Sequence, residues 1–150
     1  MSDIKFYMRE VDKNGVVVDG TLRDLEVDFE GLRYCKAEGL LDIGKPRIYT
    51  ETYADSDKVR TYIPDNLTNE ATTVTLTLYF VGDNALQTLQ DFNDYIRYGH
   101  HEFWDTQRNL KFTFYLGSEI KISEEQYKGG TIYYEVKYTL NNVYGKTYKI

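Results

Sequence analysis

The chain has 150 residues, a formal net charge of −6 and a pI near 4.9. This length suits one domain around one core, and the 15% aromatic content, with 15 tyrosines, excludes a disordered composition. The negative charge argues against ordinary nucleic-acid binding and against binding to anionic membranes, because the field of the molecule repels both.

The compartment is predicted from three features of the sequence. The first ten residues carry four charges and lack the apolar core of a signal peptide. No apolar run approaches the ~18 residues of a membrane span. Cys35 is the single cysteine and cannot form an internal disulfide, which agrees with a reducing compartment. We therefore expect synthesis in the cytoplasm and no membrane partner.

The N-terminal third predicts paired strands. Residues 4–9 alternate between apolar and polar, Asn14-Gly15 predicts a tight turn, and residues 16–18 can return as a second strand. Residues 25–29 also alternate and predict a half-buried strand, with a possible partner at residues 32–37 beyond Gly31.

Residues 44–68 have a different pattern. Residues 47–53 and 58–63 can each form a strand, and they flank the polar tip formed by residues 54–57. The segment predicts a long, exposed β-hairpin, with a surface loop as the alternative. The sequence otherwise gives no reason to divide the chain, so we expect one β-rich domain over residues 1–150.

The most regular pattern lies at residues 73–81, which alternate between apolar and polar side chains and predict a strand. Asp83 or Asn84 can cap a following helix. The helix is predicted by apolar residues at spacings of four, three and four, and it ends near Gly99. They are Ala85, Leu89, Phe92 and Ile96.

The remaining segments again predict strands. Residues 110–116 and 120–122 form a candidate hairpin around Gly117-Ser118, and residues 132–140 form a long strand after Gly129-Gly130. The chain as a whole therefore predicts a mainly β fold with one helix.

Few residues are candidates for catalysis or metal binding. His100, His101 and Glu102 could form a metal site or an acid/base pair, but adjacent histidines diverge, so a polar helix end is the simpler interpretation. Cys35 could be a nucleophile or a small half-buried residue. The sequence has no phosphate-binding glycine loop and no G-x-S-x-G turn. We expect no enzyme, no metal and no cofactor.

From residue 73 to residue 140 the order of elements resembles that of phage tail proteins. It runs from an alternating strand through a short helix and an aromatic strand to a hairpin and a long closing strand. The segments that carry the resemblance are VTLTLYF ending at Phe80, the helix from Ala85 to Tyr98, LKFTFYL ending at Leu116 and YYEVKYTL ending at Leu140. The chain is similar to the tail-tube and distal-tail group of long-tailed bacteriophages.

This resemblance implies a fold and a function. The fold is a β-sandwich or partly open barrel with one flanking α-helix. The function is that of a structural subunit in a ring or adaptor, commonly a hexamer in that family, around the channel through which DNA leaves the capsid. The partners are other copies and other tail proteins, and the location is the virion tail, assembled from subunits made in the bacterial cytoplasm.

The 44–68 hairpin resembles in placement the extended loops by which tube subunits meet. Tyrosine and arginine are enriched at interface anchors, so the candidate subunit-contact residues are Arg47, Tyr49, Tyr53, Arg60 and Tyr62. The alternative function is a carbohydrate- or protein-binding β-sandwich, in which exposed tyrosines and Trp104 form a stacking platform for a glycan. The simpler interpretation is that the tyrosine rings pack against side chains of neighbouring strands.

Overall fold

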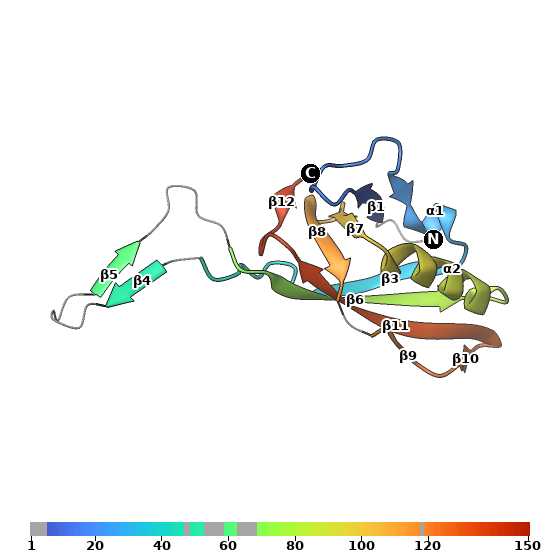
Figure 1. Cartoon of the computed structure of the whole chain (residues 1–150). Helices are drawn as coiled ribbons and strands as arrows, with labels where there is room; N and C mark the ends of the chain where they lie inside the picture. The colour runs from blue at the N-terminus through green and yellow to red at the C-terminus, as the bar shows by residue number, and fades with distance from the viewer. Residues whose placement is uncertain (1–5, 47–48, 53–58, 63–68, 118) are drawn as a thin grey trace.

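The computed structural model describes residues 6–46, 49–52, 59–62, 69–117 and 119–150. Within these residues, ten strands form one antiparallel sheet (Figure 1). The strands are β1 (Phe6–Val11), β2 (Arg23–Asp24), β3 (Leu32–Glu38), β6 (Thr72–Val81), β7 (His100–Asp105), β8 (Leu110–Leu116), β9 (Lys121–Ile122), β10 (Gln126–Lys128), β11 (Thr131–Asn142) and β12 (Tyr148–Lys149). Two helices accompany them, α1 (Leu25–Asp28) and α2 (Ala85–Arg97). The predicted mainly β fold with one flanking helix is confirmed.

The sheet is built around its longest pair. The strand order is β2-β1-β7-β8-β11-β6-β3, with β9 and β10 also paired to β11 and β12 paired to β8. β6 and β11 run antiparallel from Thr72 opposite Asn142 to Val81 opposite Tyr133. Side chains alternate across a strand, so one face of this pair is apolar and buried. The buried residues are Val74, Leu76, Leu78, Phe80, Tyr134, Val136, Tyr138 and Leu140.

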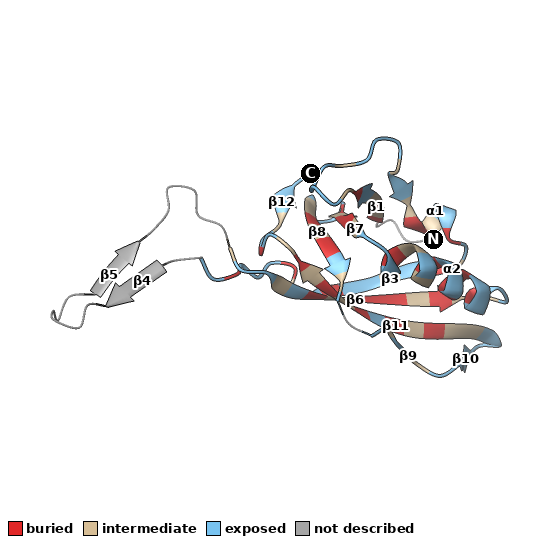
Figure 2. Cartoon of the chain, in the orientation of Figure 1, coloured by how far each residue is buried: buried red, intermediate tan, exposed pale blue. Residues whose placement is uncertain are grey.

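The sheet curls until its two ends meet. β1 and β3 stand far apart in the strand order, yet the rings of Phe6 and Tyr34 lie 5.2 Å apart between centroids. Tyr34 also stacks on Phe103 of β7 at 6.3 Å. The buried side chains therefore line the inside of one curled sheet. Figure 2 marks their positions along the ribbon in red. Of the two predicted architectures, the main sheet corresponds to the partly open barrel.

Helix α2 covers part of this interior. Its buried side chains are Ala85, Thr88, Leu89, Phe92 and Ile96, the apolar stripe predicted from the sequence together with Thr88. The Phe92 ring contacts Tyr138 of β11 at 5.4 Å and Phe80 of β6 at 5.8 Å. Asn84 occupies the N-cap position, although its side chain makes no capping hydrogen bond. The helix is therefore held by its buried face more than by its cap.

Three local strand predictions differ from the structure. Residues 25–29 alternate like a strand, but Leu25–Asp28 form α1, because the Asp24 side chain caps the turn by accepting a hydrogen bond from the Glu26 amide at 3.2 Å. Residues 16–18 do turn back along β1, with Val17 bridged to Val11 and the Val18 amide donating to the Glu10 carbonyl at 3.0 Å, but they form no strand. The strand partners of β1 are β7 and β2.

The predicted hairpin of residues 110–116 and 120–122 is wrong in its pairing. Both segments contain strands, β8 and β9, but β9 pairs with β11 and not with β8.

Candidate functional site

The segment predicted as a hairpin contains β4 (Tyr49–Thr52) and β5 (Val59–Tyr62), which pair antiparallel in a sheet of their own. Figure 1 shows this pair, hereafter the projecting hairpin, standing apart from the ten-stranded sheet. Tyr49 is opposite Tyr62, and Arg60 is opposite Glu51. Three of the five candidate contact residues therefore share one strand pair. The other two, Arg47 and Tyr53, lie outside the described residues.

The stem of the projecting hairpin, residues 44–46 and 69–70, is attached to the C-terminal segment. Pro46 and Asn69 form a bridge, and the Glu70 amide donates a hydrogen bond to the Lys45 carbonyl at 2.8 Å. The Gly44 amide donates to the Gly145 carbonyl at 2.7 Å. Three separate segments of backbone thus meet at the point where the hairpin leaves the sheet.

The close approach of these backbone segments leaves no room for a side chain on Gly44 or Gly145. A Cβ atom on Gly44 would lie 1.8 Å from the Glu70 carbonyl oxygen, and one on Gly145 would lie 2.1 Å from the same atom. Gly145 also has a φ of +66°, a conformation that side chains disfavour. The two glycines allow the close approach that fixes the stem.

His100, His101 and Glu102 do not close the helix as predicted. Helix α2 ends at Arg97, and the three residues begin strand β7. His101 points inward, where its ring contacts Tyr95 at 4.7 Å and stacks on Phe114 at 5.8 Å. Burial, and to a lesser extent the charge of His100, lowers the pKa of His101 to about 4. The imidazole is therefore a neutral core residue at pH 7.

Glu102 points to the opposite face of β7. Its Oε1 atom accepts hydrogen bonds from Arg9 Nε at 2.9 Å and from the Trp104 indole, and Lys111 Nζ lies 3.9 Å away. The Arg9 guanidinium also lies 4.9 Å from the centre of the Trp104 ring. The predicted sugar platform at Trp104 is thus already engaged by side chains of the same chain, as a cation–π and ion-pair cluster.

Cys35 is exposed on β3, at a bulge between Tyr34 and Lys36. Its side chain interacts with the phenol of Tyr79 on β6. The pKa of the Tyr79 phenol is raised, first by a hydrogen bond with Cys35 and next by the charges of Cys35 and Glu135. The prediction that Cys35 is half-buried is therefore wrong, because the bulge leaves the thiol exposed to solvent.

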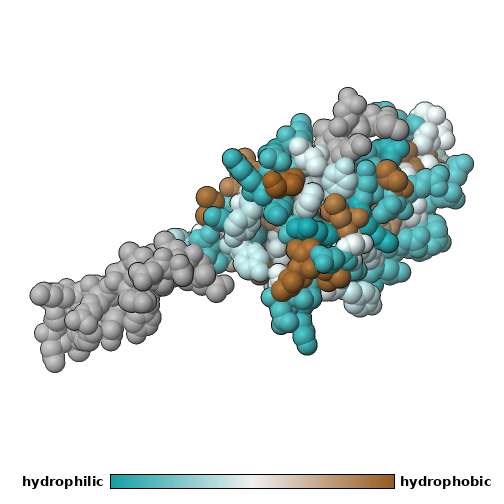
Figure 3. Space-filling view, turned by 90° about the horizontal axis from the view of Figure 1, so that it is seen from above, coloured by the Kyte–Doolittle hydropathy of each residue, from teal (hydrophilic) through white to brown (hydrophobic). Residues whose placement is uncertain are grey.

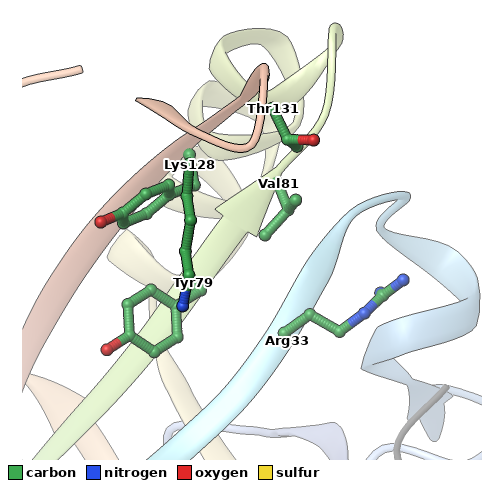
Figure 4. Close-up of a pocket in the computed structure, with 6 residues that line it drawn as sticks. Arg33, Tyr79, Val81, Lys128 and Thr131 are labelled. Carbon is green, nitrogen blue, oxygen red and sulfur yellow. The ribbon is translucent and has the colours of Figure 1, made fainter. Parts of the chain in front are cut away.

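An open groove lies on the outer face of β3, β6, β10 and β11 (Figure 4). Its volume is about 560 Å³, and its lining residues are Arg33, Tyr79, Val81, Lys128, Thr131 and Tyr133. Strand register brings them together, since Arg33 is opposite Tyr79 and Thr131 is opposite Lys128. We call this feature the outer groove. The outer groove is not among the sites predicted from the sequence, although the outward tyrosines of two long strands are a partial signal.

Among the described residues, no group of three or more histidine, cysteine, aspartate or glutamate side chains could hold a metal ion. Neither α1 nor α2, the two helices of the described chain, is long and apolar enough to cross a membrane. On the face seen in Figure 3, apolar residues lie in small groups among hydrophilic ones.

The sequence was also compared with known proteins. No family model matches the chain. No curated protein matches it.

Proposed function

We propose that this protein is a structural subunit of a phage or prophage tail, which forms a ring or adaptor with other copies and other tail proteins around a DNA channel. The observation that carries the proposal is the projecting hairpin on its fixed stem. In this role the protein acts through protein–protein contacts and without a catalytic step.

The first argument concerns stability. A two-stranded hairpin is at best marginally stable on its own in water. β4 and β5 form a sheet separate from the main one, so a neighbouring subunit that packs on them would stabilise the pair. The tyrosine pair at Tyr49 and Tyr62 would be the anchor, because aromatic residues carry much of the binding energy at interfaces.

The second argument concerns geometry and charge. The hydrogen bond from Gly44 to Gly145, together with that from Glu70 to Lys45, would hold the base of the hairpin in one place before any partner arrives, which lowers the entropy cost of association. A subunit with a net charge of −6 also repels DNA, which suits a channel that passes DNA without retaining it.

The proposal is tested by light scattering and site-specific cross-linking. The mass of the full chain should rise with concentration towards that of a ring. A photo-reactive phenylalanine analogue at Tyr62 should form cross-links between chains, whereas the same group at Tyr115, which is 42% exposed on the outside of β8, should form few. A monomer at every concentration, or cross-links from Tyr115 and none from Tyr62, would contradict the proposal.

A further inference from the structure

The outer groove combines two kinds of side chain. Tyr79 and Tyr133 form an aromatic wall, with their rings 6.1 Å apart between centroids and inclined at 69°. Arg33 and Lys128 supply two cations from β3 and β10. Figure 4 shows Lys128 extending towards Tyr79, with Arg33 on the β3 side of Val81. The groove therefore offers an aromatic surface beside positive charge.

These cations are not neutralised within the described chain. The ion pairs among its residues involve other basic side chains, and Arg33 donates only to the backbone carbonyl of Leu32, at 2.8 Å. Both Arg33 and Lys128 are exposed. No carboxylate is among the lining residues, although Glu135 is directly opposite Tyr79 in the ladder and helps to raise the pKa of its phenol. Lys128 therefore places an exposed cation, without an ion-pair partner among the described residues, beside the aromatic pair.

The shape of the groove indicates the class of ligand. Its volume of about 560 Å³ lies within the range of roughly 300–1,000 Å³ that is typical of small-ligand sites. A protein partner would instead need a flat surface of roughly 800 Å² on each side. The half-buried rings of Tyr79 and Tyr133 can pack against the apolar C–H face of a pyranose, and the Tyr133 hydroxyl can bond a sugar hydroxyl.

We propose that the outer groove binds an acidic saccharide, with a pyranose ring against Tyr79 and Tyr133 and its carboxylate bound by Lys128. Charge-assisted hydrogen bonds from a guanidinium or ammonium group to a carboxylate are among the stronger ones available to a protein. The outer groove shares no residue with the projecting hairpin. Saccharide binding would therefore be a second role of the protein, in addition to its proposed role in assembly.

The test is calorimetric titration of the full chain with tetragalacturonate, its carboxyl-reduced neutral counterpart, and tetraglutamate. Tetragalacturonate should bind, and the neutral sugar should bind about tenfold more weakly because the charge-assisted bonds are lost. Lys128→Gln and Tyr133→Ala should each weaken tetragalacturonate binding by about tenfold, from loss of the cation and of the aromatic contact.

Matched controls are available on the same outer surface. Lys137→Gln changes an exposed lysine of β11 outside the groove, and Tyr115→Ala removes an exposed tyrosine of β8. Neither should change the affinity, and thermal melts of all four variants should show folded protein.

Three outcomes would overturn the proposal. One is the absence of tetragalacturonate binding at millimolar concentrations. A second is equal weakening by Lys137→Gln and Lys128→Gln. The third is equal binding of tetraglutamate that is insensitive to Tyr133→Ala, since this would indicate a charge-only site for acidic peptides.

Discussion

His101 combines complete burial with a titratable ring. Its side chain is 1% exposed, and its Nδ1 atom has no hydrogen-bond partner among the described residues. Protonation would place an uncompensated charge between two aromatic rings, which is why the pKa falls from 6.5 to about 4. The residue therefore links the stability of the fold to pH.

The direction of this link is fixed by the lowered pKa. Between pH 4 and 6.5 the unfolded chain binds a proton at His101 that the folded chain does not, so the free energy of unfolding should rise with pH across this window and level off above it. The contribution of this one group is on the order of 3 kcal/mol. Urea unfolding of wild type and His101→Leu from pH 4 to 8 measures it.

The variant should lose most of this slope between pH 4 and 6.5. His100→Gln is the matched control, because His100 is only half-buried on the same strand and the variant should keep the slope. An equal slope in wild type and His101→Leu would mean that other groups produce the pH dependence.

At the scale of elements, strands in which apolar and polar residues alternate regularly could be predicted, and strands without this alternation could not. β6 and β11 bury one side chain in two along their length, so the sequence pattern located both. β7 was missed, because two of its inward positions are occupied by the polar residues His101 and Asp105. α1 was mistaken for a strand, since a single capped turn is too short to show helical periodicity.

The two candidate sites also differ in how far they could be predicted from the sequence. The strand pair of the projecting hairpin joins neighbouring segments, so its pairing could be expected from residues 47–63 alone. The outer groove depends on the register between β3, β6, β10 and β11. Register over such separations is set by the packed core as a whole, and no local pattern specifies it.

The stem is the element whose glycines can be tested directly. Gly145→Ala should destabilise the fold more than Gly20→Ala, because both have positive φ angles but only Gly145 has a backbone oxygen in the way. The excess should be about 1–3 kcal/mol, the usual cost of inserting a methyl group without space. Urea unfolding of the two variants measures the difference, and equal losses would show that the contact at Glu70 relaxes freely.

At the scale of the whole molecule, the main sheet has its own core and the projecting hairpin belongs to a separate sheet. The two should therefore be separable. Replacing residues 47–68 with an Asn-Gly turn between Pro46 and Asn69 should leave the melting temperature almost unchanged, because that bridge closes the stem, while concentration-dependent assembly should be lost.

The two readouts are circular dichroism melts and light scattering. Lys137→Gln is the control, since its altered side chain lies on β11 and should leave both readouts unchanged. Assembly that survives removal of the hairpin would move the subunit contacts to the main sheet. A large loss of melting temperature would mean that the hairpin contributes to the core.

The hydrogen bond between Gly44 and Gly145 also has a consequence for biosynthesis. On the ribosome, Gly44 emerges about a hundred residues before Gly145, so this contact of the stem forms only after Gly145 has been synthesised. A nascent chain that ends before Gly145 lacks the hydrogen bond that ties the hairpin base to the C-terminal segment. The base of the hairpin is therefore one of the last parts of the described chain to reach its final position.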